Sequence, residues 1–163
     1  MSEKDTTASS APKGAPSPME LVLQFHRTYS MPIQPFTSPT LDYERLGMRM
    51  SLIAEEFAEL MGAVYGPRAR AIIEEATAQA VASDEGERDV IESADALADL
   101  VYVIYGMALE TGIDLAAVLA EVQRSNMSKL GADGRPVYRE DGKVLKGPGY
   151  FPPDVAGVLG IGS

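Results

Sequence analysis

The 163-residue sequence contains no cysteine and a single histidine, His26. The absence of cysteine excludes a disulfide framework, a thiolate zinc site and a cysteine nucleophile. A lone histidine also argues against a histidine-based zinc site and against a di-iron centre, which needs Glu-x-x-His pairs. Basic residues are scarce, because 14 Lys and Arg face 24 Asp and Glu, for a formal net charge of −10. This balance excludes a nucleic-acid-binding face, but not a nucleotide substrate whose phosphates are neutralised by magnesium.

The sequence also has no run of 18 apolar residues, and no basic N-terminal region followed by an apolar stretch. The first absence predicts that no segment spans a membrane. The second predicts that there is no secretory signal. We therefore expect a cytoplasmic protein without a membrane partner.

The patterns that are present are mostly helical. Residues 1–17 are rich in Ser, Thr, Ala, Pro and Lys without periodicity, which predicts a disordered tail before one domain at 18–163. Apolar periodicity with Gly and Pro punctuation predicts an all-α fold, a bundle of four to five helices. Asp141-Gly142 predicts a short C-terminal β-hairpin or extended segment. The expected helices begin at Pro18 and then cover residues 41–64, 67–82, 88–111 and 115–129.

The first long helix combines an apolar seam with three glutamates. At 100° per residue, Glu55, Glu56 and Glu59 occupy an arc of roughly 100° beside this seam, with Glu56 nearest the core. Carboxylates beside a core need a positive partner, so the three are candidate metal ligands and catalytic groups. The seam repeats in steps of four and three and comprises Leu46, Met50, Ile53, Phe57, Leu60 and Val64.

The second long helix carries another acidic stripe. This helix is apolar on most sides, so we expect it to lie centrally in the bundle. Glu92, Asp95 and Asp99 are spaced three and four residues apart and fall within about 60° of one another on the helical wheel. Tyr102 continues the stripe and is a candidate substrate contact. Three acids on one side of a helix repel one another unless a cation neutralises them.

Polar residues interrupt the inner face of the last predicted helix, at Asn126 and Lys129. Lys129, together with Lys143 and Lys146 of the predicted hairpin, can donate to phosphate oxygens. Each feature also has an ordinary structural explanation. Acids and lysines commonly lie on solvated faces, and Tyr102 can be a core residue.

Two acidic helices can gather four or more carboxylates. Hard oxygen ligands in that number suit Mg²⁺, with Mn²⁺ as a substitute. A carboxylate that is not wholly used as a ligand can orient or deprotonate a water. Two hypotheses follow: a metal-dependent hydrolase of a phosphate compound, and a non-catalytic helical module whose acids hold a structural cation.

Four motifs stand in order along the chain: Glu55-Glu56-x-x-Glu59, Asp95-Ala-Leu-Ala-Asp99-Leu-Val-Tyr-Val-Ile-Tyr-Gly106, Asn126-Met-Ser-Lys129 and Asp141-Gly-Lys143-Val-Leu-Lys146. Together they resemble the all-α nucleotide pyrophosphohydrolase superfamily, which includes MazG, the dimeric dUTPases and phosphoribosyl-ATP pyrophosphohydrolase. The resemblance covers Phe25 to Asp154 and is greatest to the MazG-like branch labelled phosphoribosyl-ATP pyrophosphohydrolase-like.

The resemblance implies Mg²⁺-dependent cleavage between the α- and β-phosphates of a nucleoside triphosphate, giving the monophosphate and pyrophosphate. It implies a homodimer or homotetramer with a house-cleaning role against dUTP or a non-standard nucleotide. Glu56 and Glu59 would bind the metal, and Glu55 would help hold the metal or the attacking water. The positions that would contact the nucleotide and its phosphates are Asn126, Lys129, Lys143 and Lys146.

The sequence departs from the superfamily at the second acidic motif, Glu-x-x-Asp. Asp99 matches the aspartate of the motif, but Ala96 stands where its glutamate is expected. Either Asp95 supplies that ligand, or the motif is Glu92-Ser-Ala-Asp95 and Asp99 is an additional acid. Helical geometry permits both. Phosphoribosyl-ATP hydrolysis is the alternative activity, and the C-terminal lysines fit it less well.

Overall fold

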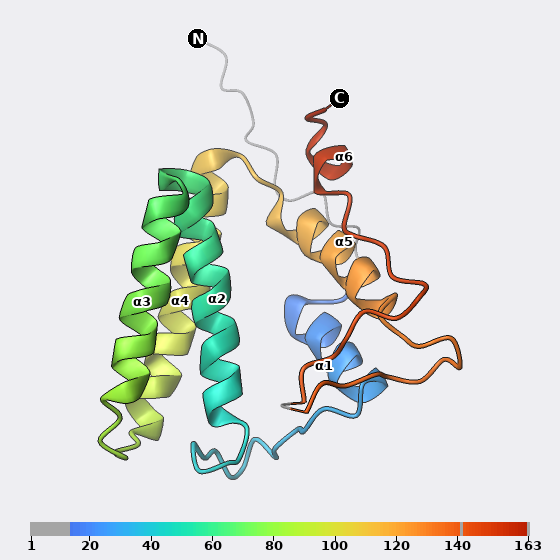
Figure 1. The fold of residues 1–163 in the computed structure, drawn as a ribbon. Coiled ribbons are helices and arrows are strands. Elements are labelled where there is room, and N and C mark those ends of the chain that lie inside the picture. The colour runs from blue at the N-terminus through green and yellow to red at the C-terminus, as the bar shows by residue number, and fades with distance from the viewer. Residues whose placement is uncertain (1–13, 141, 163) are drawn as a thin grey trace. The chain divides into compact units, whose positions relative to one another are not determined.

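The computed structural model describes residues 14–140 and 142–162 (Figure 1). Most of the predicted N-terminal tail, residues 1–13, and Asp141 of the predicted turn lie outside these ranges. The chain forms two compact units: one is Pro35–Ala96, and the other combines Met1–Gln34 with Leu97–Ser163.

The fold is all-α, as the sequence predicts. The predicted hairpin is a single antiparallel bridge between Tyr138 and Val144. The second helix begins at Leu46 rather than at residue 41, and the other predicted ends differ by no more than two residues. A short sixth helix was not expected. The helices of the described residues are α1 (Pro18–Thr28), α2 (Leu46–Tyr65), α3 (Pro67–Ala82), α4 (Val90–Thr111), α5 (Leu115–Met127) and α6 (Val155–Leu159).

Local signals explain where several helices begin. Ser17 and Glu20 form a reciprocal capping box at the start of α1, with Pro18 in the first turn. The side chain of Asp114 accepts a hydrogen bond from the backbone N–H of Ala117 and caps α5. Gly66, at φ 94°, separates α2 from α3, a conformation that strongly favours glycine.

The α2–α3 hairpin of the first unit packs through small residues. Ala58 is buried, and Gly62 lies four residues later on the same helical face. A Cβ added to Gly62 would lie 3.0 Å from the Cβ of Arg70 on α3, which shows how closely the two helices approach there. The buried face of α2 is therefore its alanine and glycine face.

The apolar seam of α2 is not the surface that meets α3. Five of its six side chains are exposed, from 36% for Ile53 to 53% for Met50. Glu56, predicted nearest the core, is exposed as well. On the helical wheel it lies about 160° from Ala58, because it precedes that residue by two positions.

The expectation that the second long helix lies centrally was also wrong for the single chain. Only Ala108 of α4 is buried, while Ile91 and Leu109 are more than 80% exposed. Among the described residues, no single helix is long and apolar enough to cross a membrane. Only α4 and α5 together, bent by 113°, satisfy that test of length and composition.

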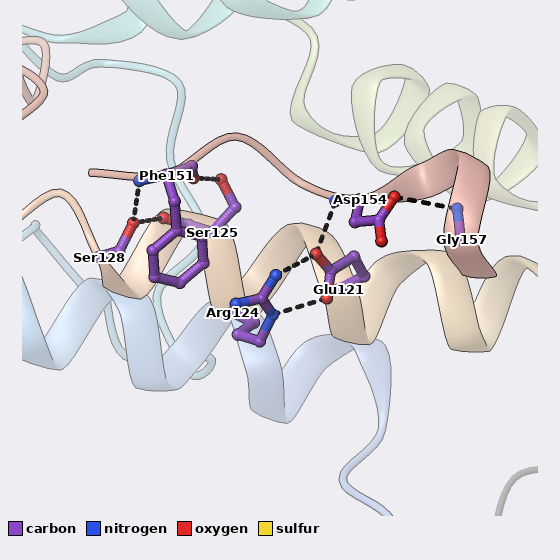
Figure 2. A network of polar contacts seen from close by, with 7 residues as sticks. All are labelled: Glu121, Arg124, Ser125, Ser128, Phe151, Asp154 and Gly157. Carbon is purple, nitrogen blue, oxygen red and sulfur yellow. Dashed lines mark hydrogen bonds and ion pairs between the residues drawn. The ribbon is translucent and has the colours of Figure 1, made fainter. Parts of the chain in front are cut away.

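In the second unit, α5 packs against α1 and α6. Tyr29, which follows α1, is fully buried and stacks on Phe25 with 4.4 Å between the ring centroids. The C-terminal segment lies along α5 (Figure 2), where Ser125 donates a hydrogen bond to the carbonyl oxygen of Phe151 at 2.8 Å. At the same place, the backbone N–H of Phe151 donates to Ser128 at 3.1 Å.

A second contact fixes the segment nearer the start of α5. The backbone N–H of Asp154 donates to Glu121 at 2.7 Å, and Glu121 is paired with Arg124 (Figure 2). The guanidinium of Arg124 also lies 4.2 Å from the centroid of the Phe151 ring. The side chain of Asp154 then caps α6 by accepting from Gly157. The C-terminal segment is thus held on α5 at both places.

Candidate functional site

The acids predicted on the first long helix lie in the middle of α2. Glu55, Glu56 and Glu59 are all exposed. Glu55 and Glu59 share one side of the helix, because they are four residues apart, while Glu56 lies farther round. Glu59 is paired with Arg70 of α3, whose Nη2 lies 3.3 Å from Glu59 Oε1. The structure therefore keeps these carboxylates in water and pairs Glu59 with a cation of the neighbouring helix.

The acids predicted on the second long helix lie in the first half of α4 and are also exposed. Asp89 starts this helix, since its Oδ1 accepts hydrogen bonds from the backbone N–H groups of Ile91 and Glu92 at 2.9 and 3.0 Å. Asp95 and Asp99 follow along the helix, and Tyr102 beyond them is 80% exposed. The helical placement of the stripe agrees with the sequence, and both alternatives at Ala96 stay open.

The donor chemistry of these six acids fits Mg²⁺ or Mn²⁺, which prefer carboxylate oxygens. Within residues 14–140 and 142–162, however, no three His, Cys, Asp or Glu side chains are gathered closely enough to hold a metal ion. A single described chain thus supplies the ligand types without assembling them. The metal ligands Glu56, Glu59, Glu92, Asp95 and Asp99 stay a prediction.

The predicted phosphate and nucleotide contacts from Asn126 onward lie in the unit that includes Leu97–Ser163, and the structure brings their segments together. Asn126 is in the last turn of α5, and Lys129 follows it. The backbone N–H of Gly147 donates to the carbonyl oxygen of Lys129 at 3.1 Å, which joins the bridge segment to the end of α5. A Cβ at Gly147 would lie 1.9 Å from the carbonyl oxygen of Leu130, so only glycine fits this approach.

The lysines of this segment have defined surroundings. Lys143 adjoins the bridge, where its carbonyl oxygen accepts from the backbone N–H of Arg139 at 2.9 Å. The ammonium of Lys146 lies 4.4 Å from the centroid of the Tyr150 ring, a cation–π contact. That contact holds the Lys146 side chain against its own segment. Phosphate binding by Lys143 and Lys146 stays a prediction.

Two residues important for these regions were missed by sequence reasoning. Arg70 pairs with Glu59 and also donates from Nε to Glu74 at 2.7 Å, and this hydrogen bond is the main cause that raises the Arg70 pKa. The only signal in the sequence was the i, i+4 spacing of Arg70 and Glu74, which is typical of an ion pair on a helix. Tyr29 donates to the carbonyl oxygen of Asn126 at 2.8 Å, a long-range contact with no local signature.

Comparisons with known proteins agree with this architecture. A family model described as phosphoribosyl-ATP pyrophosphohydrolase matches residues 22–126. A solved structure from Exiguobacterium sp. 255-15, provisionally described as an NTP pyrophosphohydrolase, is 30% identical to the chain, with a TM-score of 0.66. That match covers 88% of this chain and 94% of the other. No curated protein matches the chain.

The helical fold, the acidic helices and these matches define the class, a hydrolase that acts on phosphoric anhydrides. More specifically, the chain belongs to the phosphoribosyl-ATP pyrophosphohydrolase family, within the MazG-like all-α NTP pyrophosphohydrolase superfamily.

Proposed function

We propose that this chain is a nucleoside triphosphate pyrophosphohydrolase, dependent on Mg²⁺ or Mn²⁺. It adds one water across the anhydride between the α- and β-phosphates and releases a nucleoside monophosphate and pyrophosphate. One observation carries the proposal: the family match over residues 22–126 contains the three acids predicted on α2 and the three predicted on α4, all of them exposed. A pyrophosphohydrolase needs such carboxylates, whereas a solvated face does not require them in two sets.

In this proposal the metal ligands come from both acidic helices, and the metal supplies positive charge to the phosphate oxygens. Glu55 and Glu56 orient the attacking water and accept its proton, which an exposed carboxylate can do. Asn126, Lys129 and Tyr102 bind the nucleotide. The ligands are Glu56 and Glu59 on α2 with Glu92, Asp95 and Asp99 on α4, and the lysines proposed to bind phosphate are Lys129, Lys143 and Lys146.

We further propose that the active form is a homodimer or homotetramer. The apolar side chains left exposed on α2 and α4, including Phe57 at 48% and Val103 at 60%, are too many for a stable monomer surface. A second copy of the chain would cover these side chains. It would also supply the further carboxylates that a single chain does not gather around a metal ion. Sedimentation equilibrium tests this, and a monomer at micromolar concentration would contradict it.

Two substrate classes fit the shared chemistry. A house-cleaning role against dUTP or a non-standard nucleotide is the first. Phosphoribosyl-ATP is the second, and it is favoured by the description of the matching family. That match ends at Asn126, so the bridge segment with Lys143 and Lys146 lies outside it and argues for the first class.

The test is a screen of nucleoside triphosphates, dUTP and phosphoribosyl-ATP with Mg²⁺ or Mn²⁺, in which pyrophosphate and orthophosphate are measured separately. We expect pyrophosphate as the product. In Glu56→Gln the rate of pyrophosphate release should fall by at least about 100-fold, the size of a general-base contribution. Glu110→Gln, an exposed acid near the end of α4, is the matched control. Orthophosphate as the only product would contradict α–β cleavage. Metal binding without turnover of any substrate would identify a non-catalytic module.

A further inference from the structure

Arg70 occupies an unusual position for a surface arginine, because it belongs to α3 but reaches an acid of α2. Its Nη2 lies 3.3 Å from Glu59 Oε1, while its Nε donates to Glu74 Oε1 at 2.7 Å. The two contacts use different nitrogens of one planar guanidinium. Holding Glu74 therefore fixes the plane from which the remaining nitrogen meets Glu59.

Close packing between α2 and α3 also fixes the position of the Arg70 backbone. Gly62 of α2 faces the Arg70 stem so closely that an added Cβ would lie 3.0 Å from the Arg70 Cβ and 3.5 Å from its Cδ. Ala58, one turn earlier, is 1% exposed. The small residues of α2 thus admit the Arg70 stem, and Glu59 lies immediately beside Ala58 in the chain.

We infer that Arg70 is a positioning residue for Glu59 that strengthens divalent-cation binding by holding one oxygen of this carboxylate. This inference rests on the proposed function, in which Glu59 is a metal ligand. The ion pair with Arg70 is formed through Oε1 of Glu59, and in this inference Oε2 binds the cation. Fixing the carboxylate in advance lowers the entropy lost when the metal binds.

The positive charge of Arg70 does not by itself make it compete with the metal ion for Glu59. Glu59, Arg70 and Glu74 form a chain of two carboxylates and one guanidinium, which carries one net negative charge. The second carboxylate therefore offsets the repulsion between the guanidinium and a cation. Ligating carboxylates are commonly held in this way by outer hydrogen-bond partners, and loss of such a partner lowers metal affinity by about 10–100-fold.

The experiment measures Mn²⁺ binding to the full chain by calorimetry, before any substrate is added. We expect Arg70→Gln to bind Mn²⁺ about 10–100-fold more weakly than the wild type. Arg68→Gln is the matched control, since it removes the same charge from an exposed position of the same helix, and its affinity should stay within about twofold. Arg70→Lys should be intermediate, because one ammonium cannot hold both carboxylates in the same geometry.

Three further measurements separate positioning from a structural role. Thermal unfolding should be similar in Arg70→Gln and Arg68→Gln, because Arg70 and its partners are about half exposed. Glu74→Gln leaves the α2–α3 packing intact and frees Arg70, so it should weaken Mn²⁺ binding even if Arg70→Gln folds poorly. In turnover, the Mn²⁺ concentration for half-maximal activity should rise while kcat at saturating Mn²⁺ is nearly unchanged.

The outcomes are distinct. If the wild type binds Mn²⁺ and Arg70→Gln binds it equally well or more tightly, the role of Arg70 is overturned and the proposed function is not. If Arg70→Lys equals the wild type, charge suffices and positioning is overturned. If the wild type binds no Mn²⁺, the proposed function fails and this inference fails with it.

Discussion

The phenol of Tyr29 donates a hydrogen bond to the backbone carbonyl oxygen of Asn126, 2.8 Å away, across 97 positions of the chain. The bond joins the residue that follows α1 to the last turn of α5. Burial raises the pKa of Tyr29, and a backbone hydrogen bond with Lys129 acts in the opposite direction. A neutral, fully buried tyrosine therefore holds the stretch Asn126–Lys129 in place.

Replacing Tyr29 by phenylalanine should lower the free energy of unfolding by about 1–2 kcal/mol, because a buried hydrogen bond is lost. Urea denaturation measures this, with Tyr65→Phe as the control, since Tyr65 is 72% exposed. The folded pKa of Tyr29 lies above the ordinary value of 10, so its contribution is complete below pH 10 and is lost as the pH rises further. A difference between wild type and Tyr29→Phe that stays constant above pH 10 would contradict this explanation.

Gly147→Ala should separate the bridge segment from α5. The new Cβ would lie 1.9 Å from the Leu130 carbonyl oxygen, so the backbone must move. We expect a loss of about 1–3 kcal/mol in stability, as for other overpacked sites, and a higher KM if Lys143 and Lys146 bind phosphate. Gly149→Ala is the control, because a Cβ there meets no atom within 4 Å. Equal melting temperatures for the two variants would show that the approach is not tight.

Ser125→Ala should loosen the C-terminal segment. Ser125 is buried and its hydroxyl donates to the Phe151 carbonyl oxygen at 2.8 Å. Losing this donor should cost about 1 kcal/mol or more in stability and speed hydrogen exchange after Gly147. Ser51→Ala removes an exposed hydroxyl that bonds within its own helix, so it should change stability by less than about 0.5 kcal/mol. Unchanged exchange in Ser125→Ala would argue against the contact.

Acid should release the same segment near Asp154. The pKa of Glu121 is lowered to about 2. The main cause is the hydrogen bond from Arg124, and the next is the hydrogen bond from the backbone N–H of Asp154. Since this value is below the ordinary 4.5, the Glu121 contribution to stability is complete above pH 4.5 and is lost as the pH falls toward 2. Melting temperatures of wild type and Glu121→Gln should therefore differ at pH 6 and converge near pH 2. A difference that persists at pH 2 would contradict the assignment.

Local signals at helix ends made part of the fold predictable. The bounds of α3 were predicted because Gly66-Pro67 can end one helix and start the next. The caps at Ser17 and Asp114 are local signals of the same kind. Each signal acts within a few residues. Sequence therefore gave the type and approximate extent of the helices.

Partners across the chain could not be predicted in the same way. The period of the α2 seam shows that Phe57 lies on an apolar face, but not that α3 packs on the Ala58 face instead. The Glu59–Arg70 pair depends on how two helices approach at Gly62. The acids of the candidate site could be predicted from residue types. The residues that contact these acids could be identified only from the structure.

The docking of the C-terminal segment on α5 gives it the character of a tethered peptide ligand (Figure 2). A short flexible tether keeps such a ligand at a local concentration of about a millimolar, so contacts that are weak in solution are nearly saturated. A chain cut after Lys146 would lose that advantage, although every residue of the α5 surface would remain. The severed peptide, residues 147–163, could restore the docking only when supplied at a comparable concentration.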